Sequence, residues 1–307
     1  MQRTLKRAIR LEGIGLHMGQ DTSIRICPAG VDKGVRFRRT DVSKGDNEVV
    51  ARWDNVCSSR LNTTLCNDDG ISVSTVEHVM AALAGCAIQN AEIEIDGPEV
   101  PVFDGSARPV VRAVLDAGVE VQNASQRMLK ILEPVRVEKG DAYAELLPSE
   151  TLEIEFTIDF ADAAIGRQTL RRNFANGVFV REFCDCRTFC RLSDVTAMQS
   201  NGLALGGSLD NAVVIDGEKV LNPGGFRRAD ECVRHKMLDA LGDLALTGGP
   251  LMAHYRGYKA GHAMTNALLR KLFETPSAYT WTTVSERTSA CLPGRDLTDA
   301  DLVAVAA

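Results

Sequence analysis

One stretch of the chain reads Glu231-Cys-Val-Arg-His235-Lys236-Met-Leu-Asp239-Ala-Leu-Gly-Asp243-Leu244. We expect a helix over residues 229–246, and on a helix the side chains of His235 and Asp239, four residues apart, lie on one face. An imidazole and a carboxylate in this arrangement are a usable pair of ligands for a divalent metal such as zinc. A surface pair on an amphipathic helix gives the same spacing, so the pair alone leaves both interpretations open.

A third ligand is available upstream, in the segment Ser74-Thr-Val-Glu77-His78. A catalytic zinc takes three ligands from the protein and keeps one position for water, which fits the set His78, His235 and Asp239. Glu77 directly precedes His78, so its carboxylate can reach that water as a general base. The alternative for Glu77 is a solvated acid in the first turn of a helix, where the helix dipole favours it.

Another histidine, His262, follows Lys259-Ala-Gly at the start of an expected helix over residues 262–273. The helix dipole lowers the pKa of a histidine at that position, and a nearby carboxylate raises it. Asp243 lies one helical turn beyond Asp239, where its carboxylate could hold His262 protonated as a general acid for a leaving amine. A packed or capping histidine is the alternative.

Composition excludes several classes of protein. The chain has 307 residues, 45% of them hydrophobic and 25% charged, which is typical of a globular protein. A net charge of −6 offers no basic surface for nucleic acid. No apolar run approaches the ~18 residues that span a bilayer, and the N-terminus lacks the apolar core of a signal peptide. We therefore expect a cytoplasmic protein that does not span a membrane.

The nine cysteines are an odd number at irregular spacing, which favours free thiols in a reducing compartment. Cys184, Cys186 and Cys190 are close enough in sequence to suggest a metal site. They lack the second cysteine or histidine pair of a structural zinc site, so packed or half-exposed thiols are the preferred interpretation.

The pattern of elements divides near residues 123–126. Strand-like and helical runs occur on both sides, which predicts an α+β protein of two similar β/α domains over residues 1–123 and 127–276. Residues 277–307 lose periodicity and are expected to form a loose tail. Expected strands cover residues 22–26, 35–38, 91–95, 129–137, 142–147 and 152–158, with a hairpin at 212–215 and 219–221. Expected helices cover residues 76–83, 107–117, 193–200, 229–246 and 262–273, the first capped by Ser74-Thr75.

Seven segments in a fixed order resemble motifs of the UDP-3-O-acyl-N-acetylglucosamine deacetylase family of lipid A synthesis in Gram-negative bacteria. The resemblance runs from about residue 2 to about residue 273. The segments are Gly13-Ile-Gly-Leu-His17-Met-Gly19, Ser74-Thr-Val-Glu77-His78, Pro101-Val-Phe-Asp104-Gly-Ser-Ala107, Arg187-Thr188-Phe189, Gly202-Leu-Ala-Leu-Gly-Gly207-Ser, His235-Lys236-Met-Leu-Asp239-Ala-Leu-Gly-Asp243 and Tyr258-Lys259-Ala-Gly-His262.

This resemblance implies a zinc hydrolase that removes acetate from the sugar nitrogen of a UDP-linked, acylated amino sugar. It also implies a sandwich of sheet, helix, helix and sheet, with the site where the two domains meet, and we expect a monomer. By motif, it implies zinc ligands at His78, His235 and Asp239, a general base at Glu77, a general acid at His262 oriented by Asp243, an oxyanion-binding hydroxyl at Thr188, and substrate contacts at Phe189, Lys236 and Lys259.

Two departures from the family pattern concern substrate contacts. Cys190-Arg191 follows Phe189 where Gly-Phe is frequent, and the segment around Asn62 lacks a cysteine that many members carry. His17 is interpreted as structural, because the metal already has three ligands. Two other functions stay open: a serine or cysteine hydrolase using Ser106 or a thiol, and a non-catalytic sugar-nucleotide-binding protein with a structural metal.

Overall fold

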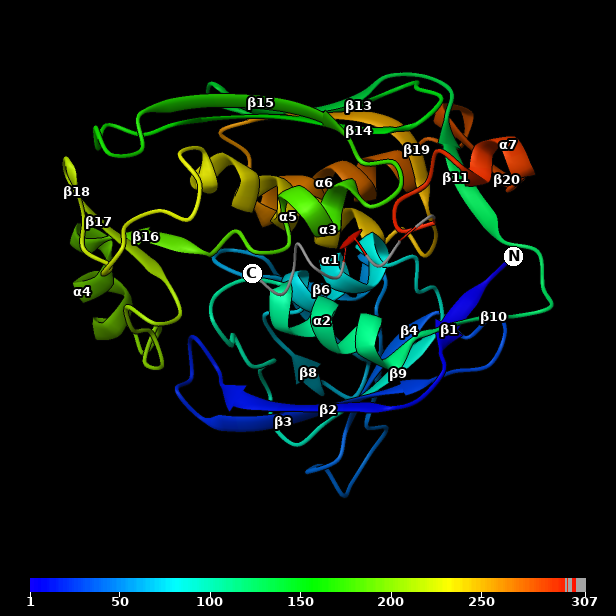
Figure 1. The fold of residues 1–307 in the computed structure, drawn as a ribbon, viewed down its shortest axis with the longest axis horizontal. Coiled ribbons are helices and arrows are strands. Elements are labelled where there is room, and N and C mark those ends of the chain that lie inside the picture. Colours follow the sequence, from blue (N-terminus) through cyan, green and yellow to red (C-terminus); the bar gives the residue numbers. More distant parts are fainter. Residues whose placement is uncertain (296, 298–299, 302–307) are drawn as a thin grey trace.

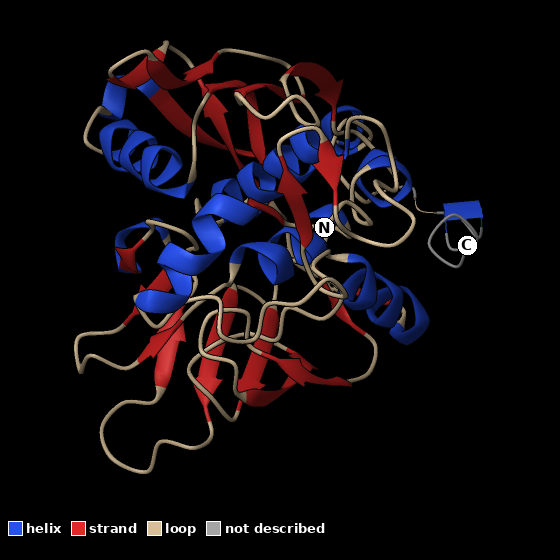
Figure 2. Cartoon of the chain, turned by 90° about the vertical axis from the view of Figure 1, so that its left-hand side faces the viewer, coloured by secondary structure: helices blue, strands red, loops and turns tan. Residues whose placement is uncertain are grey.

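The computed structural model describes residues 1–295, 297, 300 and 301. Two layers of strands enclose a layer of helices, with α1, α2, α5 and α6 between them (Figure 1). Figure 2 shows the same helical layer from the side, between an upper and a lower sheet. The α+β sandwich expected from the sequence is confirmed. The division into domains at residues 1–123 and 127–276 stays a prediction.

The lower sheet buries one side of each strand, as its alternating sequence predicts. In β9, Ala91, Ile93 and Ile95 are buried, while Glu92 and Glu94 on the other face bond to Arg38. The expected strands at 22–26, 35–38 and 91–95 all occur here. The order in the sheet is β2 (Ile9–Ile14), β3 (Asp21–Pro28), β9 (Ala91–Ile95), β4 (Val35–Arg39) and β5 (Glu48–Val50).

The upper sheet contains seven strands among the described residues. The single strand expected over 129–137 is wrong: it is two strands interrupted at Pro134, which has no N–H for a sheet hydrogen bond. The sheet runs β12 (Val135–Lys139), β13 (Ala142–Leu147), β19 (Leu251–Tyr258), β11 (Arg127–Ile131) and β20 (Tyr279–Thr283), and β14 (Leu152–Asp159) pairs with both β19 and β15 (Arg167–Asn173).

The expectation of a loose tail from residue 277 is wrong where the chain is described. β20 pairs antiparallel with β11 along its whole length. Further on, Leu292 accepts a backbone hydrogen bond from Asn176, and Gly294 donates one back to it. The elements here are η2 (Pro276–Ala278) and α7 (Glu286–Ser289). Residues 296, 298–299 and 302–307 of that predicted tail lie outside the described residues.

Two central helices cross so closely that a glycine is required at the contact. A Cβ on Gly242 of α5 (Glu231–Ala245) would lie 2.0 Å from the carbonyl oxygen of Glu77. That oxygen belongs to the first residue of α1 (Glu77–Gly85), a helix buried on almost every side. The crossing therefore sets the first turn of α1 against one face of α5. The other helices of this layer are α2 (Arg108–Ala117), α3 (Val178–Glu182) and α6 (His262–Phe273).

The start of α1 is not capped as the sequence suggested. The cap residue is Val76, which makes no side-chain capping bond. Thr75 has a φ of 58°, an unusual value for a β-branched residue, and its hydroxyl donates to Oε1 of Glu99 at 2.9 Å. Thr75 therefore anchors the chain just before the helix instead of capping it.

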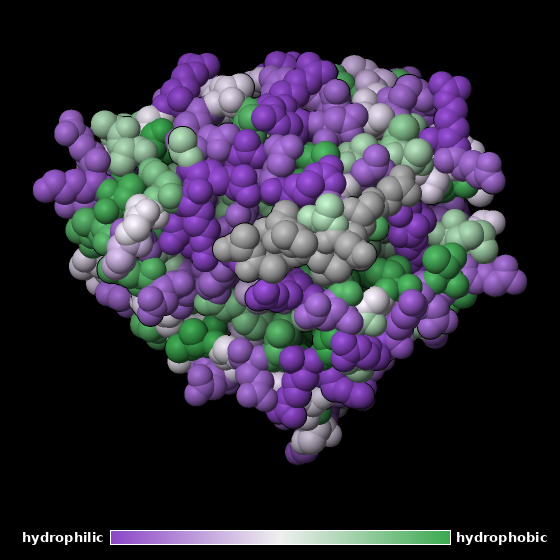
Figure 3. Space-filling view, viewed as in Figure 1, coloured by the Kyte–Doolittle hydropathy of each residue, from purple (hydrophilic) through white to green (hydrophobic). Residues whose placement is uncertain are grey.

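A small layer stands at one edge of the sandwich. It contains β16 (Phe189–Arg191), β17 (Val213–Asp216), β18 (Lys219–Val220) and α4 (Leu192–Ser200) (left in Figure 1). Apolar side chains gather on the surface of this edge (Figure 3), and Leu192, Leu205, Leu209 and Leu221 are exposed. The remaining elements are β1 (Arg3–Leu5), β10 (Val119–Val121), η1 (Trp53–Asn55), β6 (Val56–Ser58), β7 (Thr64–Cys66) and β8 (Ser72–Val73).

Candidate active site

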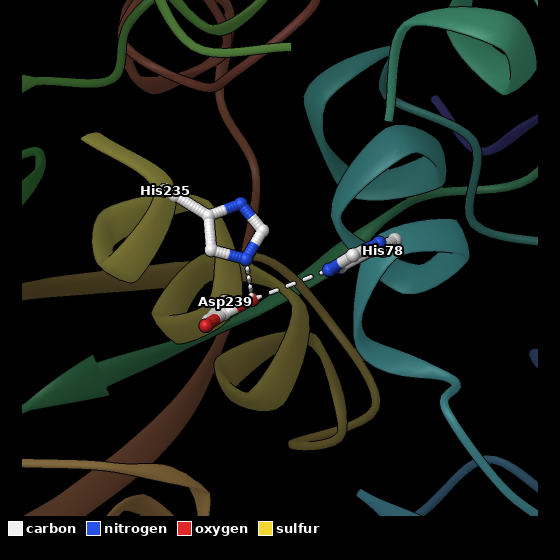
Figure 4. Close-up of side chains that lie close together, drawn as sticks. All are labelled: His78, His235 and Asp239. Carbon is white, nitrogen blue, oxygen red and sulfur yellow. Dashed lines mark ion pairs between the residues drawn. The ribbon is translucent and has the colours of Figure 1, made fainter. Parts of the chain in front are cut away.

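The crossing of α1 and α5 brings together three candidate metal ligands, all buried (Figure 4). Oδ1 of Asp239 lies 3.3 Å from Nε2 of His235 and 3.6 Å from Nε2 of His78. This oxygen is buried and has no hydrogen-bond partner among the described residues. Sequence spacing predicted the pair on α5, and the fold brings the third predicted ligand, His78, to this pair from a different helix.

These side chains fit a zinc ion. Ligand atoms ~2.0–2.1 Å from a tetrahedral zinc lie ~3.3 Å from each other, close to the 3.3 and 3.6 Å between Asp239 and the two histidine nitrogens. Nδ1 of His235 lies 3.1 Å from the carbonyl oxygen of Cys186, a bond that directs the Nε2 lone pair toward Asp239. Burial lowers the pKa of His235 to about 3, so its ring is neutral, as a metal ligand must be.

Lys236 holds the second oxygen of the same carboxylate. Its Nζ donates to Oδ2 of Asp239 at 2.6 Å. Burial acts to raise the pKa of Asp239, but the positive charges of Lys236 and His262 outweigh it and keep the pKa well below its usual range. Asp239 is therefore an ionised candidate ligand whose orientation is fixed by a neighbour on the same helix.

His262 lies beside this group, at the first residue of α6. Its Nδ1 donates to Oδ2 of Asp243 at 2.9 Å, and its Nε2 is 3.9 Å from Oε1 of Glu77. Burial lowers the pKa of His262, but the carboxylates of Asp243 and Glu77 outweigh it and raise the pKa to about 9. Burial raises the pKa of Glu77. The pairing of Asp243 with His262 that the sequence suggested is therefore present in the structure.

A cavity of about 570 Å³ begins at these residues and extends to the small edge layer. Thr188 and Phe189, both singled out from the sequence, line it. The Phe189 ring meets that of His235 edge to face, with centroids 6.3 Å apart. The cavity is polar where the candidate ligands lie and mainly apolar toward α4, where Asp194 and Gln199 also line it; the apolar walls there include Val195, Met198, Ala204, Leu209 and Leu221.

Lys259 is the one predicted substrate contact that does not line this cavity. Its Nζ pairs with Asp141 at 2.8 Å and Asp159 at 3.3 Å, and its backbone φ is 50°. The ammonium group thus stands among acids near the surface. Sequence reasoning missed Phe160, which lines the cavity and packs against Phe189, because a single aromatic residue at a strand end gives no signal.

The surroundings of the other candidate residues indicate structural roles. The thiols of Cys184, Cys186 and Cys190 have raised pKa values, chiefly through burial, which makes them poor nucleophiles and poor ligands. Ser106 donates to Asp104 at 2.8 Å and has no bond to a histidine among the described residues. His17 lines the cavity, and its backbone N–H donates to Glu99.

Comparison with known proteins identifies the family. The model of the UDP-3-O-acyl N-acetylglycosamine deacetylase family matches residues 2–274. The chain belongs to this family. It is 46% identical over 285 residues to the UDP-3-O-acyl-N-acetylglucosamine deacetylase of Phenylobacterium zucineum, covering 93% of this chain and 97% of that protein. Enzymes with the same name from Idiomarina loihiensis and Haemophilus influenzae are 45% and 44% identical, each over 93% of this chain and 94% of the relative.

Within the described part of the chain, no helix has both the length and the apolar character needed to cross a membrane.

Proposed function

We propose that this protein hydrolyses the N-acetyl group of UDP-3-O-acyl-N-acetylglucosamine with a zinc ion and releases acetate, the committed step of lipid A biosynthesis. The observation that carries the proposal is the buried group of His78, His235 and Asp239, with one unpaired carboxylate oxygen, at the end of a cavity. Membership of the deacetylase family supports the substrate. Nine free cysteines support a reducing cytoplasm as the location.

Held by these three ligands, zinc supplies a Lewis acid that polarises the acetyl carbonyl and lowers the pKa of the attacking water. Glu77 accepts the proton of that water at Oε1, the carboxylate oxygen that faces His262. The hydroxyl of Thr188, in the cavity wall, donates to the oxyanion that forms on the acetyl carbon.

His262 supplies the proton for the departing nitrogen. Its Nδ1 is bound to Asp243, so the proton on Nε2 is the one that faces Glu77 and the ligands. A pKa raised to about 9 keeps this ring protonated at neutral pH, as a general acid requires. Glu77 is buried beside the protonated His262. In this pair Glu77 can therefore accept a proton while His262 donates one.

The remaining groups bind the substrate. The apolar walls toward α4 take the acyl chain, since each methylene removed from water contributes ~0.8 kcal/mol. Phe189, in the cavity wall, contacts the substrate. Lys236 and Lys259 serve the polar sugar-nucleotide part as compact cations. Lys259 reaches the diphosphate outside the cavity wall, and this contact would replace its present pairing with Asp141.

The test is acetate release from the acylated UDP sugar by protein treated with a chelator and then given limited zinc. We expect activity to disappear on treatment and return with about one zinc per chain. Full turnover in metal-free protein would contradict the proposal and favour a serine or cysteine hydrolase. Metal binding without turnover by intact protein would favour a non-catalytic binding protein.

A further inference from the structure

A buried threonine lies behind the two acidic groups that serve the proton transfers. Thr63 is 2% exposed and belongs to the loop between β6 and β7. Its backbone N–H donates to Oε2 of Glu77 at 3.0 Å, and its hydroxyl donates to Oδ1 of Asp243 at 2.6 Å. One residue is therefore bonded to a carboxylate on α1 and to a carboxylate on α5.

The two bonds leave one oxygen of each carboxylate for chemistry. Oε1 of Glu77 faces Nε2 of His262 at 3.9 Å, and Oδ2 of Asp243 accepts the Nδ1 proton of His262 at 2.9 Å. Hydrogen bonds to charged acceptors are about twice as strong as neutral ones, and these are shielded from water. Thr63 thus fixes the rotation of both carboxylates relative to the same imidazole.

Thr63 is itself held against the start of α1. Its carbonyl oxygen accepts the N–H of Val76 at 3.3 Å, one residue before Glu77. The neighbouring Asn62 donates from Nδ2 to Oγ1 of Thr75 at 2.8 Å. The loop is therefore tied to the first turn of α1, and the hydroxyl of Thr63 adds a hydrogen bond from this loop to α5.

We propose that Thr63 is a positioning residue for the deacetylation: it aligns the general base Glu77 with the Asp243–His262 pair. The proposal rests on the proposed function. Thr63 does not line the cavity, so it acts through these neighbours and contacts neither substrate nor metal. Its loss should lower kcat and leave KM and metal content unchanged, because binding and the metal ligands do not depend on this hydroxyl.

The experiment compares Thr63→Val, which removes the hydroxyl at nearly constant volume, with Thr63→Ser, which retains it. Thr247→Val is the matched control, since Thr247 is also buried and its hydroxyl bonds to the carbonyl oxygens of Leu244 and Gly249 at the far end of α5. We expect kcat to fall about 10- to 100-fold in Thr63→Val, with KM within about twofold. Thr63→Ser should keep at least about a third of wild-type kcat, and Thr247→Val should match the wild type.

A kcat for Thr63→Val within about twofold of wild type would overturn the proposal. So would equal losses in the valine and serine variants, or a loss of zinc from Thr63→Val, since either points to a structural role. The melting temperatures of both valine variants show whether a loss of kcat is caused by lower stability of the fold and not by misaligned carboxylates.

A second readout does not depend on turnover. In the full-length protein labelled with ¹⁵N-histidine, the Nδ1 proton of His262, identified by its absence in His262→Gln, reports its bond to Asp243. Thr63→Val should shift this resonance and speed its exchange with water, whereas Thr247→Val should do neither. An unchanged resonance overturns the proposal. If wild-type protein releases no acetate, the proposed function fails, and this resonance still decides the role of Thr63.

Discussion

The two ends of the cavity are built in different ways. The polar end is formed by α1, α5 and the start of α6, where His78, His235 and His262 are all buried. The apolar end is formed by the edge layer, and none of the nine described residues of α4 is buried. Proton transfer and metal binding need atoms fixed in place, whereas an apolar wall needs only area removed from water.

This difference predicts how each end responds to substitution. At the polar end a substitution should cause a large loss of activity, because a buried charged group that loses its partner is strongly destabilised. At the apolar end a substitution should weaken substrate binding in proportion to the apolar contact area that it removes.

The largest effect is expected from His78→Ala. Removing one of three ligands should abolish both zinc binding and acetate release, because the remaining two side chains belong to α5 alone. Metal analysis and an activity assay on the same sample measure this. His254→Ala is the control, since His254 lies in β19 beside Glu153 and Glu155, away from the cavity. A variant that lacks His78 but keeps a full complement of zinc would remove it from the ligand set.

Next in size is the loss of the proton-transfer groups. Glu77→Gln and His262→Gln should each lower kcat by ~10²–10⁴, the usual contribution of a general base or acid. Both should retain zinc, because neither side chain belongs to the group of three ligands. Loss of zinc in either variant would show that the residue is a ligand and that its assigned role is wrong.

The third prediction concerns pH. Burial lowers the pKa of His262, but Asp243 and Glu77 outweigh it and raise the pKa to about 9. Because a general acid must be protonated, activity should be present below this pKa and be lost as the pH rises through it. Glu77 must be ionised, and burial raises its pKa, so the acidic limb should lie above the range of an ordinary carboxylate. A bound divalent cation opposes both shifts.

Asp243→Asn tests the alkaline limb directly. Removing this negative charge should lower the pKa of His262, so the alkaline limb should move toward lower pH by about one unit or more. The acidic limb, set by Glu77, should move much less. A profile of kcat/KM between pH 5 and 10 measures both limbs. An alkaline limb at the same pH in wild type and variant would disprove the assignment of that limb to His262.

Sequence reasoning succeeded where the signal is local. The expected strands at 91–95 and 142–147 and the helix at 262–273 have the predicted bounds, because each has a clear alternation or a clear helix start. The i, i+4 spacing of His235 and Asp239 also survives in the fold, since both lie on one helix.

Sequence reasoning failed where a feature depends on contacts between residues far apart in the chain. The sequence of Tyr279–Thr283 does not indicate that this segment pairs with β11, some 150 residues earlier in the chain. The bond from Thr63 to Asp243 joins residues 180 positions apart, and a lone threonine carries no pattern. The sequence offered His78 as a third ligand but does not show that its segment meets α5, and the role of Thr188 came from the family resemblance alone.

The smallest effect is expected at the apolar end, from Val195→Ala on α4. Val195 is half-buried and lines the cavity, so the change removes part of the wall without touching the catalytic groups. At ~0.8 kcal/mol per methylene, we expect kcat/KM for the acylated sugar to fall about three- to tenfold, with zinc content unchanged.

The substrate provides the decisive control for this variant. UDP-N-acetylglucosamine, which has no acyl chain, should be a far poorer substrate for the wild type, and Val195→Ala should not reduce its turnover further. Thr196→Ala, on the exposed side of the same helix, should leave both substrates unaffected. If Val195→Ala lowers kcat/KM equally for both substrates, this wall affects the catalytic end, and the two ends of the cavity are not independent. A loss confined to the acylated sugar, and growing with chain length, would establish that area alone governs this end.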